Sequence, residues 1–304
     1  MWPKRQSDHA RLIAGLEDHA RKMRSLPGAN DDETRFALAM QIVASLRREA
    51  YYQAVQQKTI AASKADPNSG NFDPERAVAY HLQQGNIEEA CWLIFMMTHF
   101  ARPVTGWDRL RDVYGMLGAG TWDWNTVSQD PKAMIDWLSE NWRQVAGKFG
   151  NHRKYESIRP DSNRSFGKVL NSYLLWVGQA GHQKFFGEAV RKHGNDPKVI
   201  FDELFRTMRV TTFGRLAKFD YLAMIGRYRI APLEAGSAYL EDATGPKAGV
   251  RLLFLGDASD NSHDRELQSW LDDLDLDLAV GMEVLEDALC NWQKSPRNFV
   301  HYKG

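Results

Sequence analysis

Residues 211–222 read TTFGRLAKFDYL, and this stretch decides the fold that we predict. A helical pattern ends near Arg209, and an amphipathic helix opens after Gly214. A glycine between two helices indicates a helical hairpin, which exposes backbone N–H groups at the start of the second helix. Such groups can bind a phosphate without reading a base sequence, although a glycine before a helix is most often an ordinary turn. The predicted contact residues are Thr212, Gly214, Arg215 and Lys218.

Helical patterns also account for most of the chain outside the hairpin. Apolar residues recur at three-to-four spacing, and Asp73-Pro74-Glu75 predicts an N-cap with proline at the first helical position. Residues 250–255 are a short apolar run that fits a helix or a strand. We therefore predict an all-α fold. The expected helices cover residues 31–57, 74–100, 106–117, 131–147, 165–179, 181–193, 197–209, 213–226, 262–272 and 277–293.

Composition places the chain among soluble globular proteins. It has 304 residues, of which 43% are hydrophobic and 26% are charged. No apolar run approaches the ~18 residues that a membrane-spanning helix needs, and the first residues lead into a charged helical pattern instead of a signal peptide. We therefore expect a cytoplasmic protein with no membrane partner. We also expect an N-terminal helical extension over residues 1–70 and a main domain over 71–304, which can divide into lobes at 71–195 and 196–304.

Charge is distributed unevenly along the chain, in which 39 Lys and Arg balance 39 Asp and Glu. Residues 143–230 hold 17 basic and 7 acidic residues, a balance of +10. Residues 231–304 hold 6 basic and 14 acidic residues, a balance of −8. A basic middle third can form a phosphate-facing surface, and a set of solvated helix faces is the alternative.

The sequence contains no recognisable metal or nucleotide-cofactor motif. Cys91 and Cys290 are its two cysteines, too few for a four-cysteine zinc site or an iron–sulfur cluster. No His-Glu-x-x-His motif, Gly-rich Walker loop or dinucleotide fingerprint occurs. We therefore expect neither a metal nor a cofactor.

A second group of polar residues lies at positions 151–155, in a predicted loop. An amide, an imidazole, two cations and a phenol suit recognition of base edges, sugar hydroxyls or phosphates, with solvated side chains as the alternative. His99 is a further pocket candidate, although a histidine after an apolar helix more often belongs to the core. Arg109 and Arg111 are candidates for contact with nucleic acid. The predicted pocket residues are Asn151, His152, Arg153, Lys154, Tyr155 and His99.

An acidic residue follows the hairpin at a distinctive spacing. Counting Arg215 as the first position, Glu234 is the twentieth. This arrangement resembles the helix-hairpin-helix DNA glycosylase superfamily, in which a Gly-Arg-x-x-Ala hairpin is followed about twenty residues later by a catalytic Asp. The resemblance implies a catalytic role for Glu234, with Asp220 as the reserve candidate. Bifunctional members carry a lysine where this chain has Leu216, so the resemblance implies a monofunctional enzyme without lyase chemistry.

A closer resemblance covers the chain from about residue 85 to its end. Several blocks, in one order, resemble the group named alpha-glutamyl/putrescinyl thymine pyrophosphorylases, clade 3. This group is regarded as a branch of the glycosylase superfamily that is connected with hypermodified pyrimidines in phage DNA, and it includes anti-phage glycosylases. The blocks are EACWLIF at 89–95, THF at 98–100, GW at 106–107, RDVYG at 111–115, FGNHRKYES at 149–157, residues 213–226, TGP at 244–246 and EDALCNWQK at 286–294.

The resemblance implies an anti-phage DNA glycosylase, with DNA as its partner. Such an enzyme flips a hypermodified pyrimidine out of the DNA stack, here expected to be glucosylated hydroxymethylcytosine, and hydrolyses its N-glycosidic bond to leave an abasic site. A carboxylate facing C1′, assigned to Glu234, stabilises the positive charge that develops on the sugar. An exposed loop Glu is the structural alternative for this residue, and an ion pair with Arg227 or Arg229 is the alternative for Asp220.

Two other functions stay open. One is an enzyme that modifies or exchanges groups on hypermodified thymine in DNA, as the group's name suggests. The other is a non-catalytic DNA-binding module that uses the hairpin and the basic middle third of the chain.

Overall fold

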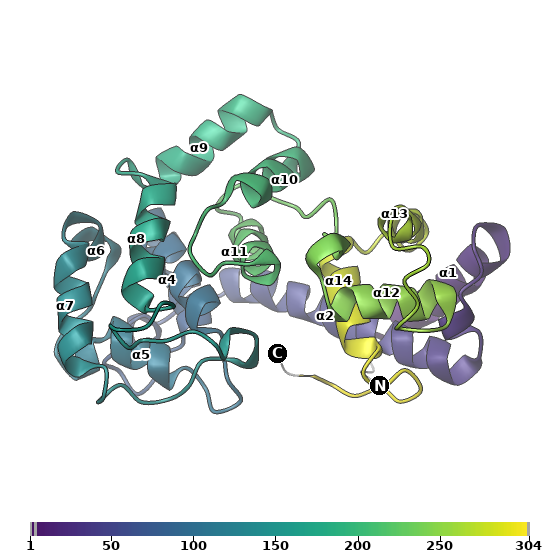
Figure 1. The fold of residues 1–304 in the computed structure, drawn as a ribbon, viewed down its shortest axis with the longest axis horizontal. Helices are drawn as coiled ribbons and strands as arrows, with labels where there is room; N and C mark the ends of the chain where they lie inside the picture. Colours follow the sequence, from purple (N-terminus) through teal and green to yellow (C-terminus); the bar gives the residue numbers. More distant parts are fainter. Residues whose placement is uncertain (1, 3–4, 303–304) are drawn as a thin grey trace. The chain divides into compact units, whose positions relative to one another are not determined.

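The computed structural model describes residue 2 and residues 5–302 of the chain. These residues form 14 α-helices joined by turns and short 3-10 segments, and within them no β-strand occurs (Figure 1). The predicted all-α class is therefore confirmed. No helix among the described residues has both the length and the apolar character needed to cross a membrane.

The chain clusters into two compact units. The first unit combines the residues up to Tyr52 with those from Glu234 on, and the second is Gln53–Leu233. The second unit is thus inserted between two halves of the first. The expected division of the chain after residue 70 stays a prediction about its functional domains.

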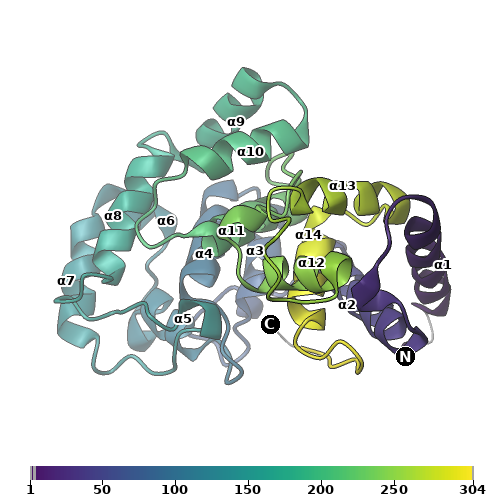
Figure 2. The same ribbon diagram turned by 45° about the vertical axis from the view of Figure 1, so that its right-hand side comes forward.

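The first unit is built from helices of both ends of the chain. In both ribbon views α12 lies against α14, and α13 also contacts α1 (Figures 1 and 2). Residues 250–255, for which the sequence left helix and strand open, are helical. The helices are α1 (Gln6–Lys22), α2 (Asp32–Gln56), α12 (Gly245–Leu255), α13 (Leu267–Leu278) and α14 (Met282–Trp292), and the last turn of α2 belongs to the second unit.

The second unit is organised around one buried helix, α4. All residues from Glu89 to Phe100 on this helix are buried, and α3, α5, α6, α9 and α11 all contact it. A helix that is apolar on every side has to be covered on every side. The helices are α3 (Pro74–Gln83), α4 (Ile87–Phe100), α5 (Asp108–Tyr114), α6 (Trp124–Gln129), α7 (Pro131–Asn141), α8 (Phe166–Val177), α9 (Gly181–His193), α10 (Pro197–Thr207) and α11 (Arg215–Arg227).

The single helix expected over residues 74–100 is wrong, because the structure has two helices there. The predicted start is confirmed, since the Asp73 side chain accepts a hydrogen bond from the N–H of Arg76. The chain then breaks at Gly85, whose φ of +73° favours glycine, and Asn86 caps α4 by accepting from the N–H of Glu89. Gly85 therefore helps to end α3, and Asn86 starts α4.

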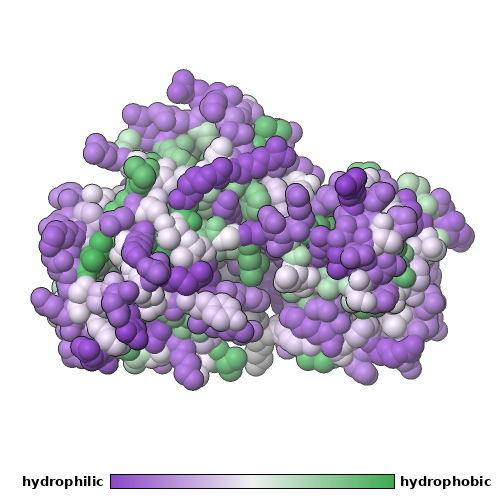
Figure 3. All heavy atoms as spheres, viewed as in Figure 1, coloured by the Kyte–Doolittle hydropathy of each residue, from purple (hydrophilic) through white to green (hydrophobic). Residues whose placement is uncertain are grey.

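Aromatic rings stack along α4 and fix the position of the hairpin before α11. The Phe95 ring lies 3.8 Å from the ring of Tyr173 and 5.7 Å from that of Phe213, and both pairs are stacked. Phe213 directly precedes Gly214. The hairpin is therefore anchored in the core. On the surface visible in Figure 3, most residues are hydrophilic, and single apolar residues lie among them.

Two helical glycines make a matched test of packing in this fold. A Cβ at Gly249 in α12 would lie 2.3 Å from the carbonyl oxygen of Leu289, whereas a Cβ at Gly187 in α9 would meet nothing within 4 Å. Both changes to alanine improve helix propensity by about 1 kcal/mol. We expect Gly187→Ala to raise the free energy of unfolding, and Gly249→Ala to lower it by about 1–3 kcal/mol because α14 must shift.

Urea denaturation of the two variants measures this difference. A Gly249→Ala protein at least as stable as Gly187→Ala would contradict the close approach of α12 to α14.

Candidate functional site

The predicted hairpin exists in the second unit, between α10 and α11. It is closed by hydrogen bonds from the N–H of Phe213 to the Val210 carbonyl and from the N–H of Gly214 to the Thr212 carbonyl, each 3.0 Å long. Gly214 is the N-cap residue of α11 and offers no side-chain oxygen to the first turn. The first-turn N–H groups of a helix have no acceptor within it, so this end of α11 presents donors.

Arg153 joins the hairpin to the predicted pocket segment. Its guanidinium donates to the Thr212 carbonyl at 2.8 Å and to the Thr212 hydroxyl at 2.9 Å, and it lies 4.9 Å from the centre of the Phe213 ring. It also donates to the carbonyl of His99 at 3.3 Å, at the end of α4. Arg153 is only 7% exposed, so the structure uses it to hold three segments together.

The other four residues of the pocket segment surround this buried arginine. Asn151, His152, Lys154 and Tyr155 are all exposed, and the Lys154 ammonium lies 5.1 Å from the centre of the Tyr155 ring. Sequence reasoning treated the five residues alike. The structure divides them into one buried clamp and four side chains on the surface.

His99 lies inside the core. It is fully buried, its ring stacks on Phe95 at 6.1 Å, and its Nε2 has no hydrogen-bond partner among the described residues. Burial, followed by the nearby charge of Arg153, lowers the pKa of His99 well below its usual value, so the ring is neutral. This placement matches the core histidine that the sequence offered as the alternative.

The predicted cations of the hairpin and of α5 contact groups of their own unit. The Lys218 ammonium donates to the Phe205 carbonyl at 3.4 Å, and the Arg215 guanidinium lies 4.9 Å from the centre of the Phe219 ring. Arg109 donates to the Gly147 carbonyl at 2.6 Å. Arg111 pairs with Asp112 at 3.0 Å and with Asp108 at 3.3 Å.

The two candidate carboxylates lie in different units. Asp220 is on α11, where its charge acts to raise the pKa of Arg153, while burial of that arginine acts more strongly to lower it. Glu234 is exposed in the loop between α11 and the 3-10 segment Leu240–Asp242, and it is the residue at which the chain returns to the first unit.

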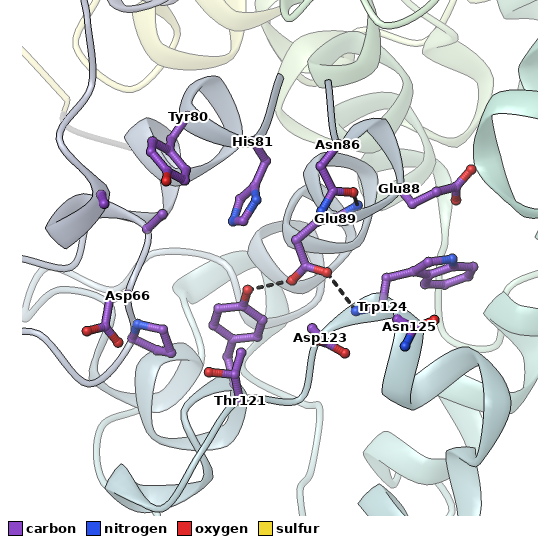
Figure 4. Close-up of a pocket in the computed structure, with 14 residues that line it drawn as sticks. Asp66, Tyr80, His81, Asn86, Glu88, Glu89, Thr121, Asp123, Trp124 and Asn125 are labelled. Carbon is purple, nitrogen blue, oxygen red and sulfur yellow. Dashed lines mark hydrogen bonds between the residues drawn. The ribbon is translucent and has the colours of Figure 1, made fainter. Parts of the chain in front are cut away.

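A cavity of about 590 Å³ lies at the other end of α4, and sequence reasoning missed it. Figure 4 shows the carboxylate of Glu89 near its centre, between the side chains of His81 and Asp123. The only signal in the sequence is the acidic pair Glu88-Glu89, which reads as an ordinary helix start. The lining residues are Ala62, Ala65, Asp66, Pro67, Tyr80, His81, Asn86, Glu88, Glu89, Tyr114, Thr121, Asp123, Trp124 and Asn125.

Glu89 is a buried carboxylate with neutral partners. It is 3% exposed and accepts hydrogen bonds from the Tyr114 hydroxyl at 2.5 Å and from the N–H of Trp124 at 2.7 Å. Burial raises the pKa of Glu89 to about 7, because these two donors compensate the lost hydration only in part. Within the described residues no cation forms an ion pair with its oxygens, so its charge is costly to hold.

The pKa of the neighbouring Glu88 is shifted in the opposite direction. Burial acts to raise its pKa, but hydrogen bonds from the His182 ring and from the N–H groups of His182 and Gln183 lower it to about 2. Glu88 thereby caps the start of α9. Gly181 permits this contact, because a Cβ there would lie 2.7 Å from a Glu88 oxygen.

A chain of hydrogen bonds runs from Glu88 towards the hairpin helix. Burial lowers the pKa of His182, so the ring is neutral, with Nδ1–H donating to Glu88 at 2.7 Å. Nε2 then accepts from the Tyr173 hydroxyl at 2.6 Å, and that hydroxyl accepts from Tyr221 at 3.0 Å. Since Tyr221 belongs to α11, this chain links one wall of the cavity to the hairpin helix.

The raised pKa of Glu89 predicts a pH-dependent effect of Glu89→Gln. The unfolded chain ionises Glu89 near pH 4.5 and the folded protein only near pH 7, so native stability due to this group falls as pH rises between those values. Glutamine is uncharged like the protonated carboxyl group, so the variant does not lose stability as pH rises. We expect the unfolding free energy of Glu89→Gln, relative to that of the original protein, to be about 3 kcal/mol larger (the variant relatively more stable) at pH 8 than at pH 4.

Chemical denaturation at both pH values, with Glu188→Gln on the exposed side of α9 as the control, measures this difference. An equal stability difference at both pH values would show that Glu89 is ionised at no unusual cost.

The structure offers no metal centre in its described part, where no three His, Cys, Asp or Glu side chains are grouped to hold an ion. No curated protein and no solved structure matches the chain. Residues 33–304 match one family, described as alpha-glutamyl/putrescinyl thymine pyrophosphorylase clade 3, which confirms the resemblance read from the sequence blocks. Because the match spans well over half of its length, the chain belongs to the alpha-glutamyl/putrescinyl thymine pyrophosphorylase clade 3 family.

Proposed function

We propose that the protein is a monofunctional DNA glycosylase with a helix-hairpin-helix glycosylase-like fold, which excises a hypermodified pyrimidine from phage DNA in anti-phage defence. Its expected substrate is glucosylated hydroxymethylcytosine. The observation that carries the proposal is the hairpin before α11, which is anchored in the core by Phe213 and has, at Gly214, open space where a side chain would lie at the start of the helix. Phage DNA enters the cytoplasm, so the enzyme acts there.

Gly214 supports a phosphate contact at this hairpin. Its φ of −74° is open to any residue, and a Cβ there would meet nothing within 4 Å. Neither backbone strain nor packing therefore requires glycine at this position. A DNA phosphate that approaches the N–H groups of α11 does require the space that a side chain would fill.

The segment at 151–155 supplies the surface beside the hairpin. Arg153 is a positioning residue, because its contacts with Thr212 bring this segment and the hairpin together. The exposed amide, imidazole, ammonium and phenol around it are groups that bind phosphates, sugar hydroxyls and base edges. We assign base and sugar contact to Asn151, His152, Lys154 and Tyr155.

Glu234 is the proposed catalytic carboxylate. In the reaction the C1′–N bond breaks with its electron pair leaving on the base, and a water oxygen forms the new bond to C1′. The carboxylate stabilises the cationic sugar and accepts the proton of that water. Exposure of Glu234 leaves it accessible to DNA, and Asp220 on α11 is the reserve candidate.

The family description favours one other function. Its words name a pyrophosphorylase of thymine that carries a glutamyl or putrescinyl group. An enzyme that exchanges groups on hypermodified thymine in DNA is therefore the second candidate. It shares the DNA partner and differs in leaving the base attached to its sugar.

The substrate assay separates the two candidates. Purified protein is incubated with DNA containing glucosylated hydroxymethylcytosine, with DNA of hypermodified thymine and with plain DNA, and abasic sites are scored. We expect abasic sites in the glucosylated DNA and none in the plain DNA. We also expect Glu234→Gln to slow excision at least about 100-fold while Glu241→Gln, a matched change on a nearby exposed residue, leaves it unaltered.

Absence of abasic sites on every modified DNA would rule out the glycosylase. Exchange of the modification without base loss would support the second candidate. Normal excision by Glu234→Gln together with loss in Asp220→Asn would move the catalytic assignment to α11.

The open space at Gly214 gives a separate test of the DNA contact. Gly214→Leu places a side chain at the start of α11, and its Cβ meets no neighbour within 4 Å, so the protein should fold normally. We expect it to weaken binding of a fluorescent DNA duplex at least about tenfold, whereas Gly187→Ala should bind as the original protein does. Unchanged binding by Gly214→Leu would place the DNA elsewhere.

A further inference from the structure

We propose that residues 142–168, here called the basic segment, bind an unpaired strand of DNA. The basic segment follows α7, ends in the first turn of α8 and lies wholly within the second unit. The choice of DNA as the partner rests on the proposed function, whereas the unpaired state of the strand is a separate inference. It follows from exposed cations without acidic partners and from ring and guanidinium faces that paired bases cannot reach.

The basic segment carries a large excess of exposed positive charge. It contains seven Lys and Arg against two Asp and Glu. Arg153 and Glu156 are buried, so six cations and one carboxylate are exposed. Arg159 pairs with Asp161 at 2.7 Å, and Glu156 accepts from Arg164. The other four exposed cations, which form no ion pair among the described residues, are Arg143, Lys148, Lys154 and Lys168. A surface of this charge attracts the phosphates of a nucleic acid.

A tryptophan flanked by two arginines gives this surface a place where bases can stack. The Arg143 guanidinium lies 4.7 Å from the centre of the Trp142 ring, and the Arg159 guanidinium lies 5.6 Å from it. Both arginines are exposed, and the tryptophan is half-buried. Aromatic rings and guanidinium planes stack on the faces of all bases. These three side chains therefore offer stacking faces for the bases and positive charge for the phosphates of one strand.

Tyr155 adds a second ring on the same segment. It is 73% exposed, and it precedes Arg159 by four positions, so the two Cα atoms are at most about 14 Å apart. A few nucleotides of one strand span that distance. Inside a duplex the face of each base is covered by its neighbours, so contact between rings and bases requires a strand that has lost its pairing. A fully paired duplex would contact the cations alone.

Hydrogen bonds to other elements hold the basic segment in place before any ligand binds. The N–H of Ala146 donates to the carboxylate of Asp112 on α5 at 2.9 Å. Further along, the N–H of Phe166 donates to the Ser157 carbonyl at 2.9 Å, which closes the loop that carries Arg159. Ordering a loop during binding lowers affinity, so a surface that is already fixed favours binding.

Fluorescence anisotropy tests the state of the strand, with a labelled plain duplex and the same duplex carrying a central bubble of unpaired thymines. We expect the bubble DNA to bind at least about fivefold more tightly than the paired duplex, because its bases can stack on the protein. Trp142→Leu should lose this preference, whereas Trp142→Phe keeps a ring and should retain most of it.

Trp270→Leu is the matched control for the loss of a tryptophan. Trp270 is likewise half-buried, and the Arg24 guanidinium lies 4.0 Å from the centre of its ring, but it belongs to α13 of the first unit. Equal affinity of the original protein for the two DNAs would overturn the proposal. So would an equal preference for bubble DNA in Trp142→Leu and Trp270→Leu.

The salt dependence of binding provides a test that changes only exposed side chains. The double variant Arg143→Gln and Arg159→Gln removes two cations of the basic segment, and Arg191→Gln with Lys192→Gln removes two exposed cations of α9 as the control. Loss of two phosphate contacts with an unpaired strand should make the slope of log affinity against log salt concentration shallower by about 1.4. We expect this change in the first double variant only. Equal slopes in the two double variants would contradict the proposal.

An unpaired RNA strand is the alternative ligand, because it offers the same phosphates and base faces. Tighter binding of an RNA strand than of a DNA strand of matching sequence would overturn the choice of DNA. All of these probes lack a modified base, so the binding measurements are independent of base excision. Failed excision with an intact preference for bubble DNA would count against the glycosylase alone, and normal excision without that preference would count against the basic segment alone.

Discussion

Burial of α4 on every side from Glu89 to Phe100 is the constraint on which the second unit depends. A helix that is apolar on all sides can be stable in water only when other helices surround it, and α3, α5, α6, α8, α9 and α11 all contact this one. The aromatic residues of α4 also decide where the hairpin lies, because Phe95 stacks on Phe213. The exposed glycine that follows Phe213 is therefore held by the deepest part of the core.

Burial also means that the unpaired backbone groups at each end of α4 need polar partners, and these partners differ between the two ends. At the N-terminus Asn86 and the acidic pair after it interact favourably with the positive end of the helix. At the C-terminus Arg153 donates to the His99 carbonyl, and the N–H of Gly150 donates to the Phe100 carbonyl at 2.9 Å. The acidic cavity and the basic hairpin region thus stand at opposite ends of one helix dipole.

The net charge of zero results from segments of opposite charge, +10 over residues 143–230 and −8 over residues 231–304. The basic residues 143–230 lie wholly within the second unit, which also contains the acidic cavity, and the acidic residues from Glu234 on belong to the first. A negative cavity and a positively charged segment can coexist in one unit because charges more than about 10 Å apart are largely screened in solution.

Local sequence alone determined the helical class, the hairpin and the family, because each depends on residues that are neighbours along the chain. The cap at Asp73 is one example, and the break at Gly85 and Asn86 is another local signal, although the long apolar pattern around it led us to predict one continuous helix. The tertiary structure alone decided that Arg153 clamps Thr212, 59 residues away, and that Glu89 is buried without a cation while Glu88 pairs with His182. The physical reason is that burial and charge compensation arise from contacts between segments distant in sequence, which the residue pattern around any one position does not encode.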